Sequence, residues 1–311
     1  MTGRLKSESG FALILTLVVT ALMVAVVVEM IHQVYVDTSL SRGFRDGQQA
    51  SILAESGATG GAKLLQMSLL NQKYTSLSDQ WATPFKIDDE VGSLEITINE
   101  ESGKININSL VQEKGENEPF TMAALKRLGT RLKIQEDVWG AVADWLDSND
   151  LPQSGGVESP YYQTLKPPYN ARNGKLMTLT ELSLVKGVTP EIFGKLRPYL
   201  TIFSDTPNSS ININTASEEV LTALDERITP SVAKRIDEER RIQPFKLQGE
   251  LSRVPELYAV ANDSRNIGRI AIVGTLFRLT SVARVKESVR TVEMVVRLTG
   301  GTPQILSWQE Y

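Results

Sequence analysis

The segment FALILTLVVTALMVAVVV occupies residues 11–28 and contains no charged side chain. A helix of about 20 apolar residues is long enough to cross the hydrocarbon core of a bilayer. The segment therefore predicts a single membrane-spanning helix over residues 11–30. The basic side chains Arg4 and Lys6 precede it. Because basic flanking residues stay in the cytoplasm, we expect a cytoplasmic N-terminus and a C-terminal head on the opposite side of the membrane.

The apolar segment begins at Phe11, directly after Gly10. An ordinary secretory signal peptide has its small-residue cleavage site after the apolar region, not before it. A Gly-Phe junction ahead of that region is typical of a prepilin leader, which is removed on the cytoplasmic side and leaves the apolar helix on the mature protein. We predict a leader over residues 1–10 and cleavage between Gly10 and Phe11. An uncleaved signal anchor is the alternative.

The composition excludes several kinds of active site. The 311 residues contain no cysteine and one histidine, His32. Thiolate chemistry, a Ser-His-Asp triad and a histidine-rich zinc site need residues that the chain lacks. The net charge of −4 gives no overall basic field that would attract nucleic acid. We therefore do not expect the chain to be an enzyme.

Small residues recur on one face of the helix beyond the predicted membrane span. Ala50, Ala54, Ala58 and Ala62 are spaced four apart and are followed by Leu65. Residues at this spacing share one face of a helix. The stripe predicts packing against a sheet of the same chain or against neighbouring helices.

Alternation of apolar and polar residues predicts strands near both ends of the remaining chain. The strands are expected within residues 92–100, 103–110, 275–300 and 305–311. The middle of the chain instead has apolar residues at helical spacing, with Pro190 and Pro230 where prolines of a first helical turn belong.

These patterns predict an α+β fold with an inserted domain. Residues 31–108 and 270–311 would form a small antiparallel sheet packed on the long N-terminal helix, as in pilins. Residues 109–269 would form a large all-α insertion. Insertion is favoured over two consecutive domains because the late strands need the early ones to bury their apolar faces.

Two parts of the insertion, residues 179–200 and 213–254, resemble helix-hairpin-helix or SAM-like repeats. In DNA-binding versions, two hairpin glycines let backbone N–H groups approach a phosphate. The hairpin at residues 226–230 lacks both glycines, and the one at 186–190 keeps only Gly187. We predict a role in packing or subunit contact. A membrane-anchored DNA-binding protein is the alternative.

Four acidic residues cluster in a loop-rich part of the insertion: Asp144, Asp147, Asp150 and Glu158. Carboxylates at short spacing, with adjacent glycines that permit tight turns, suit a hard cation such as calcium. The spacing is not that of an EF-hand loop. The simpler interpretation is that these side chains cap a helix and begin a turn.

Four further segments occur in a characteristic order: SGKININSL, ADWLDSNDLPQSGGVESPYY, LTELSLVKGVTPEIFGKLRPYLTIF and ININTASEEVL, at residues 102–110, 143–162, 179–203 and 211–221. Together with the Gly10-Phe11 junction, they resemble the K minor pseudopilin family of bacterial type II secretion systems. This is the general secretion pathway protein K family, within the type IV pilin superfamily. The resemblance covers most of the chain.

The resemblance includes a departure from ordinary pilins. Most pilins have glutamate as the fifth residue of the mature protein, where it meets the N-terminal amine of a neighbour. Counted from Phe11, the fifth residue here is Leu15. The K subunit is similar in this respect, which suits a subunit at the end of a filament. The resemblance also supports the calcium hypothesis, because the K subunit is among the pseudopilins that calcium stabilises.

The resemblance implies a structural subunit at the tip of the type II secretion pseudopilus. It would initiate or cap assembly and limit pseudopilus length during protein export across the outer membrane. The implied partners are minor pseudopilins of the I, J and H types, the inner-membrane platform, and the prepilin peptidase, with methylation of the new N-terminus and no nucleic acid. The implied location is the bacterial inner membrane, with the head in the periplasm. A minor pilin of a type IV pilus is the alternative.

Overall fold

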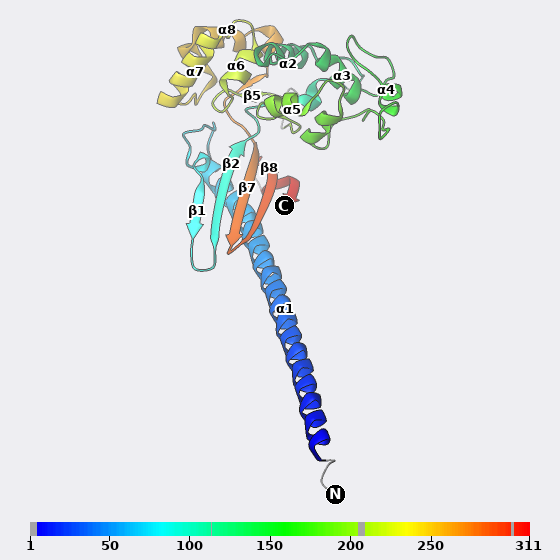
Figure 1. The fold of residues 1–311 in the computed structure, drawn as a ribbon. Helices are drawn as coiled ribbons and strands as arrows, with labels where there is room; N and C mark the ends of the chain where they lie inside the picture. Colours follow the sequence, from blue (N-terminus) through cyan, green and yellow to red (C-terminus); the bar gives the residue numbers. More distant parts are fainter. Residues whose placement is uncertain (1–4, 113, 205–208, 300–301) are drawn as a thin grey trace.

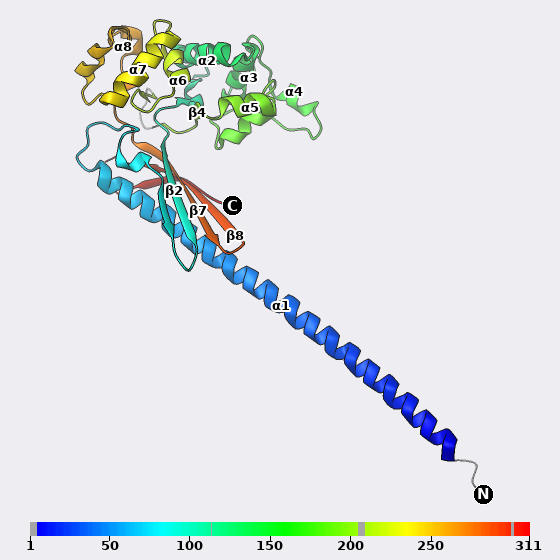
Figure 2. The same ribbon diagram turned by 60° about the vertical axis from the view of Figure 1, so that its left-hand side comes forward.

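The computed structural model describes residues 5–112, 114–204, 209–299 and 302–311. A long helix, α1 (Leu5–Leu69), projects from a head made of two parts (Figure 1). An antiparallel sheet packs on the C-terminal half of α1. A group of short helices lies beyond the end of this sheet, on the side away from the N-terminus (Figure 2). The first four residues of the predicted leader lie outside the described ranges.

The N-terminal half of α1 is apolar and exposed. Every residue from 10 to 45 is exposed, and the mean hydropathy of its most apolar window is 3.0. Among the described residues, α1 is the one helix long and apolar enough to cross a membrane. The Thr20 hydroxyl donates a hydrogen bond of 2.6 Å to the Thr16 carbonyl, so this polar group is satisfied within the helix. These features fit a single membrane anchor.

The C-terminal half of α1 packs on the sheet through small residues. Ala54, Ala58 and Leu65 are buried in the core between helix and sheet. Gly57 faces the sheet so closely that an added Cβ would lie 2.8 Å from a methyl carbon of Leu94. The predicted alanine stripe therefore lets the helix backbone approach the sheet of the same chain.

The sheet has five antiparallel strands in the order β1-β2-β7-β8-β9. They are β1 (Phe85–Asp88), β2 (Ser93–Glu100), β7 (Leu276–Val285), β8 (Ser288–Arg297) and β9 (Gln304–Glu310). Alternate apolar residues of β2, β7 and β8 point to α1, as the period of two requires. A long N-terminal helix on an antiparallel sheet is confirmed.

The second part of the head is mainly helical. Its α-helices are α2 (Pro119–Leu132), α3 (Asp137–Leu146), α4 (Ser159–Gln163), α5 (Pro190–Leu196), α6 (Glu218–Leu224), α7 (Pro230–Ile242) and α8 (Pro255–Ala261). Short 3-10 turns are η1 (Gln80–Ala82), η2 (Ile107–Ser109), η3 (Leu179–Leu184), η4 (Gln248–Arg253) and η5 (Ser264–Asn266), of which η1 lies between α1 and the sheet. Proline begins α2, α5, α7 and α8, where its missing N–H has no helical partner to lose.

The helical part is not purely α-helical, which corrects one feature of the predicted fold. β3 (Ile105–Asn106) pairs in parallel with β4 (Leu200–Thr201), and β5 (Ile211–Asn212) pairs in parallel with β6 (Ile270–Ala271). The strand expected over residues 103–110 is therefore wrong in extent and in partner. Its apolar residues are buried in the core of the helical part instead of the sheet.

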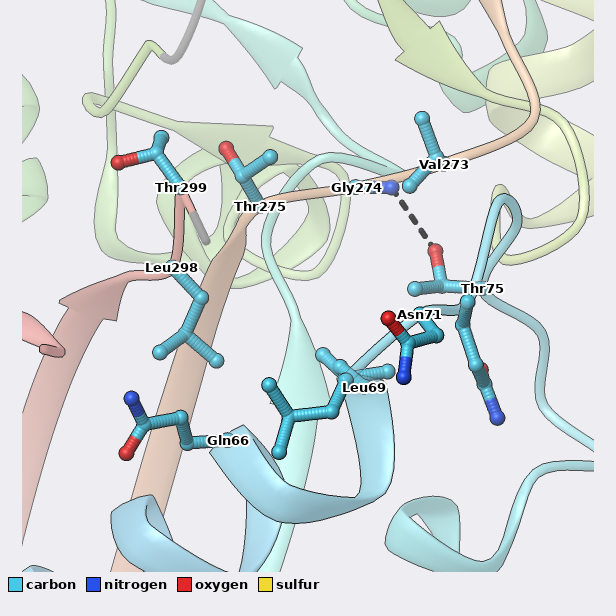
Figure 3. A pocket seen from close by; sticks show the side chains of 11 residues that line it. Gln66, Leu69, Asn71, Thr75, Val273, Gly274, Thr275, Leu298 and Thr299 are labelled. Atoms are coloured by element: carbon cyan, nitrogen blue, oxygen red, sulfur yellow. Dashed lines mark hydrogen bonds between the residues drawn. The ribbon is translucent and has the colours of Figure 1, made fainter. Parts of the chain in front are cut away.

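The chain crosses between the two parts twice, at residues 100–102 and 272–275. Asn212, from the helical part, donates hydrogen bonds to Glu100 Oε1 at 2.7 Å and to Thr75 Oγ1 at 2.8 Å. The Gly274 N–H donates to the same Thr75 oxygen at 2.8 Å (Figure 3). Because these groups are buried, their mutual hydrogen bonds fix the junction.

Candidate functional site

Three of the four predicted acidic residues come from the end of α3 and the start of α4. All residues from Val138 to Leu146 are buried, so Asp144 is a carboxylate inside a buried helix. Asp147 follows as the C-cap residue of α3, and Glu158 is the N-cap residue of α4. The loop between the two helices therefore brings Glu158 back to α3.

The structure gathers Asp144, Asp147 and Glu158 into one group. One carboxylate oxygen from each lies within 4.8 Å of the other two. The three residues are 0%, 2% and 7% exposed, respectively. Asp147 Oδ2 and both carboxylate oxygens of Glu158 are buried without a hydrogen-bond partner. Capping alone does not explain these oxygens, because buried polar atoms are normally hydrogen-bonded.

The electrostatics of this group favour a cation. Burial raises the pKa of both Asp144 and Asp147 above the ordinary value. Burial also raises the pKa of Glu158 to about 7, and the nearby charges of Asp144 and Asp147 add to this effect. Three converging carboxylates are costly when all are charged, and a bound cation would remove that cost.

The loop residues hold two of the carboxylates in place. The Gln153 N–H donates hydrogen bonds to both oxygens of Asp144, at 3.0 and 3.1 Å. The Asn149 N–H donates to Asp147 Oδ1 at 3.1 Å. The loop thus orients Asp144 and Asp147 toward each other and leaves Asp147 Oδ2 available to a ligand.

An aromatic cluster holds α4 against α3. Tyr162 is fully buried, and its ring lies edge-on to Trp145 of α3 at 5.0 Å between centroids. The same ring stacks on Tyr169 at 5.3 Å, and its hydroxyl accepts a hydrogen bond of 3.2 Å from the Lys186 N–H. Because Tyr162 lies one helical turn after Glu158, this packing fixes where the Glu158 carboxylate lies.

Asp150 does not join the group. It is exposed, and none of its oxygens belongs to the set within 4.8 Å. Its charge still raises the pKa values of Asp147 and Glu158, so it lies close enough to act electrostatically. The three residues of the group, Asp144, Asp147 and Glu158, would each offer a carboxylate oxygen as metal ligand. Carboxylate oxygen is a ligand type that calcium prefers. The group therefore fits the predicted calcium ion.

The predicted processing and assembly residues lie together near the start of α1. The helix continues across the Gly10-Phe11 junction, and a Cβ on Gly10 would meet nothing within 4 Å. Phe11 and Leu15 are 69% and 53% exposed. Cleavage after Gly10 stays a prediction.

The two predicted hairpins are turns between helices. At the first, Gly187 has a φ of +83°, and Thr189 caps α5 by accepting a hydrogen bond from the Ile192 N–H. At the second, Thr229 caps α7 in the same way. Arg227, the basic residue of the second hairpin, donates to Asp225 at 2.7 Å, so its charge is already matched.

Sequence reasoning missed the acidic residues at the junction of the two parts, Glu100 and Glu101. They follow an alternating strand pattern and look like an exposed strand end. Both are buried, and Glu101 forms ion pairs with Lys104 and Arg278. Two adjacent acids at the end of a predicted strand were the available signal, although the predicted boundary of the insertion lies later, after residue 108.

Two known protein-family models match the helical part of the chain. Both models are described as type II secretion system protein K, and they match residues 103–205 and 211–270. The two matches together cover more than half of the chain. The chain belongs to the protein K family of the type II secretion system. It is therefore a minor pseudopilin, and the alternative of a type IV pilus minor pilin is not supported.

Protein K relatives match most of the chain. Type II secretion system protein K of Pseudomonas aeruginosa is 28% identical over 262 residues, covering 80% of this chain and 77% of the relative. Protein K of Aeromonas hydrophila is 27% identical over 329 residues, covering 95% of this chain and 98% of the relative. The similarity thus extends beyond the helical part to the anchor and the sheet.

The fold also resembles a solved protein K structure. A chain in the crystal structure of the GspK-GspI-GspJ complex from the type 2 secretion system of enterotoxigenic Escherichia coli matches with a TM-score of 0.72 and 21% identity. The match covers 87% of this chain and 99% of that chain. The shared fold includes the sheet and the helical part of the head.

Proposed function

We propose that this protein is the tip subunit of the type II secretion pseudopilus, where it initiates or caps assembly and limits filament length during export across the outer membrane. Its role is structural and not enzymatic. The observation that carries this proposal is the position of the helical part. It lies beyond the end of the sheet and away from the N-terminal end of α1 (Figure 1). A subunit anchored by α1 would present this part at the top of the filament.

The apolar start of α1 supports the same role. A pilin subunit within a filament uses its glutamate to meet the N-terminal amine of a neighbour, and Leu15 offers no such carboxylate. A subunit with nothing above it has no neighbouring amine to engage in that direction. Leu15 therefore suits the end position.

The assembly route follows from the N-terminal segment. Prepilin peptidase would cut between Gly10 and Phe11 and methylate the new N-terminus. The mature helix would stay in the inner membrane, with the head in the periplasm and the inner-membrane platform as an assembly partner. The exposed apolar face of α1 and the basic residues Arg4 and Lys6 support this orientation.

We expect other minor pseudopilins as partners, of the I, J and H types. The similar crystal structure contains GspK in a complex with GspI and GspJ. The exposed apolar side chains of α1 are suited to pack against the α1 helices of such partners.

Calcium would stabilise the helical part through Asp144, Asp147 and Glu158. The ion would supply charge compensation for the three buried carboxylates and would tie α3 to α4. The helix-hairpin-helix-like repeats would serve packing and subunit contact. Two features argue against a phosphate site. The charge of Arg227 is paired with Asp225, and the first turn of α6 is acidic because it contains Glu218 and Glu219.

A unique label tests the tip position, because the chain has no cysteine. Ile242 is 84% exposed at the end of α7, so Ile242→Cys can carry a maleimide-linked gold particle. On pseudopili assembled in cells and sheared off, we expect gold at one end of each filament. A cysteine in the repeating major subunit should give gold along the whole length. Gold from Ile242→Cys distributed along the sides would overturn the tip assignment.

A length measurement tests the capping role separately. Raising the amount of this protein relative to the major subunit should shorten the pseudopili. An unchanged length distribution, with the protein still found at the ends, would leave the tip position intact and remove the length-limiting role.

A further inference from the structure

The loop between α3 and α4 lies directly against the backbone of α3, next to the acidic group. Gly140 is four residues before Asp144, so both residues are on the same face of the helix. The loop residues that cross this face are Ser154, Gly155 and Gly156. Glu158 follows two residues after the crossing.

The approach at Gly140 involves backbone on both sides. A Cβ added there would lie closer than 2.5 Å to the Ser154 carbonyl oxygen and 3.1 Å from the Gly156 nitrogen. Outside its own residue and the two adjacent ones, a Cβ atom essentially never lies closer than 3.0 Å to another heavy atom. A side chain at Gly140 would therefore push loop and helix apart by more than 0.5 Å, because the three atoms nearest to its Cβ all belong to the loop backbone.

The two loop glycines, Gly155 and Gly156, also lie close to α3. A Cβ on Gly156 would overlap the carboxylate of Asp144 and lie 3.0 Å from the Gly140 carbonyl oxygen. Gly155 has a φ of +81°, and a Cβ there would lie 2.8 Å from the Asp137 Cα. Three glycines thus share one crossing.

Gly140 is otherwise an unfavourable choice for this position. A glycine inside a helix costs about 1 kcal/mol relative to alanine. Gly194 in α5 shows that a helical glycine in this head can have open space, because a Cβ there would meet nothing within 4 Å. The close backbone crossing gives a reason for Gly140 that does not apply to Gly194.

We propose that Gly140 and Gly156 are positioning residues for the metal centre. Their missing side chains let the loop lie on α3, and this contact sets the distance between Asp144 on the helix and Glu158 after the loop. The inference rests on the proposed calcium role. Metal–ligand distances are held within about 0.2 Å, so a displacement of more than 0.5 Å matters to a site built from these two residues.

The test uses the full-length protein in detergent, with calcium affinity measured by titration calorimetry and Tm measured in calcium and in chelator. We expect Gly140→Ala to weaken calcium binding about 10-fold or more, as loss of a positioning contact typically does. The calcium-induced rise in Tm should shrink accordingly. A purely structural role would instead lower Tm by the same amount in calcium and in chelator.

Gly129→Ala is the matched control. Gly129 is a buried glycine of the neighbouring helix α2, and a Cβ there would lie 2.8 Å from the Trp139 indole nitrogen. The three nearest atoms all belong to the Trp139 side chain and none to the loop. This variant should lower Tm in both conditions and keep calcium affinity within about 2-fold of the wild type. Calcium binding to Gly140→Ala with wild-type affinity would overturn the positioning role.

Two further measurements separate the possible failures. If the wild type itself binds no calcium, the proposed metal role fails and the positioning role fails with it. If Gly140→Ala does not fold, Gly156→Ala adds a methyl on the loop side of the same crossing, where it would meet the Gly140 carbonyl and also the Asp144 carboxylate. This variant should lose calcium affinity as well. Wild-type affinity in that folded variant would also overturn the proposal.

Discussion

Glu101, directly after β2, and Arg278, near the start of β7, form an ion pair of 2.9 Å where the two parts of the head meet. Glu101 is fully buried, and it also accepts hydrogen bonds from Lys104 at 2.7 Å and from the Thr201 hydroxyl at 2.5 Å. Thr201 belongs to β4 in the helical part and Arg278 to the sheet. One buried carboxylate therefore contacts both parts of the head.

Neutralising this carboxylate should destabilise the head. Removing one partner of a buried ion pair leaves the other charge uncompensated and costs about 3–5 kcal/mol. We expect Glu101→Gln to lower the free energy of unfolding by about 3 kcal/mol, because Arg278 keeps a second partner in Glu293. Denaturant unfolding of the detergent-solubilised protein measures the change.

The control for this prediction is Glu95→Gln. Glu95 pairs with Lys86 at 3.1 Å, but both side chains are about half exposed. Exposed pairs contribute about 0–1 kcal/mol, so this variant should unfold nearly as the wild type does. Equal small effects from the two substitutions would contradict the importance of the junction.

The same carboxylate should make stability depend on acid pH. Burial alone would raise the pKa of Glu101, but the charges and hydrogen bonds of Lys104 and Arg278 outweigh it and lower the pKa from 4.5 to about 2. The folded state thus binds the proton less readily than the unfolded state. The contribution of the Glu101 carboxylate to the free energy of unfolding is therefore fully present above pH 4.5 and is lost as the pH falls toward 2.

A pH series of Tm tests this sign. As the pH is lowered from 4.5 to 2, the Tm of the wild type should fall further than the Tm of Glu101→Gln. The reason is that the glutamine side chain has no carboxylate to protonate. Other carboxylates, such as Asp225 with its pKa lowered to about 2, contribute equally in both proteins. Parallel curves for the two proteins would show that Glu101 does not carry this dependence.

Calcium should stabilise the wild type and not the variant Glu158→Gln. A ligand at 100 times its dissociation constant stabilises the folded state by about 2.7 kcal/mol. Without calcium, Glu158→Gln should be at least as stable as the wild type, because it removes one buried like charge beside Asp144 and Asp147. The measurement is Tm with calcium and with chelator.

Asp150→Asn provides the contrast within the same loop. The Asp150 side chain is exposed and lies outside the group of three carboxylates. Calcium should still raise the Tm of this variant by nearly the wild-type amount. If Asp150→Asn removes the response and Glu158→Gln keeps it, the ligand assignment is wrong.

Restoring a carboxylate at Leu15 should alter where the subunit assembles. Leu15→Glu gives α1 the acidic group that ordinary pilins use to meet a neighbour. We expect gold-labelled Leu15→Glu protein along the sides of pseudopili as well as at their ends. Leu22→Glu places the same charge near the membrane centre, at a cost of about 3 kcal/mol, and should lower the amount of inserted protein without moving the label. Labels confined to filament ends in both variants would show that Leu15 does not set the position.

The sequence predicts those parts of the fold that depend on local pattern. The apolar run and the alanine stripe predict α1, and alternation predicts the paired strands β7 and β8. The acidic group is predicted in part, because three carboxylates at the ends of adjacent helices are close in the chain as well as in space. Asp150 has the same spacing in the chain, yet the direction of the loop leaves it in solvent.

The sequence does not reveal contacts between distant segments. The alternating residues around Ile105 look like a sheet strand, but Ile105 pairs with Leu200 in the helical part. Asn212 and Glu100 are far apart in the chain, and nothing in their local sequence predicts that they share a hydrogen bond. The role of Gly140 is hidden for the same reason, because its neighbour Ser154 reaches it only through the folded loop.

The helical part leaves and rejoins the sheet at directly opposed positions. Glu100, the last residue of β2, is paired with Phe277 of β7. Paired residues of antiparallel strands are about 5 Å apart, so a turn of a few residues could join β2 to β7 without disturbing either strand. The helical part is thus an insertion between the two strands of a β-hairpin, β2 and β7. Its size and surface can change over evolution, or be exchanged by design, while the anchor and the sheet keep the same connections.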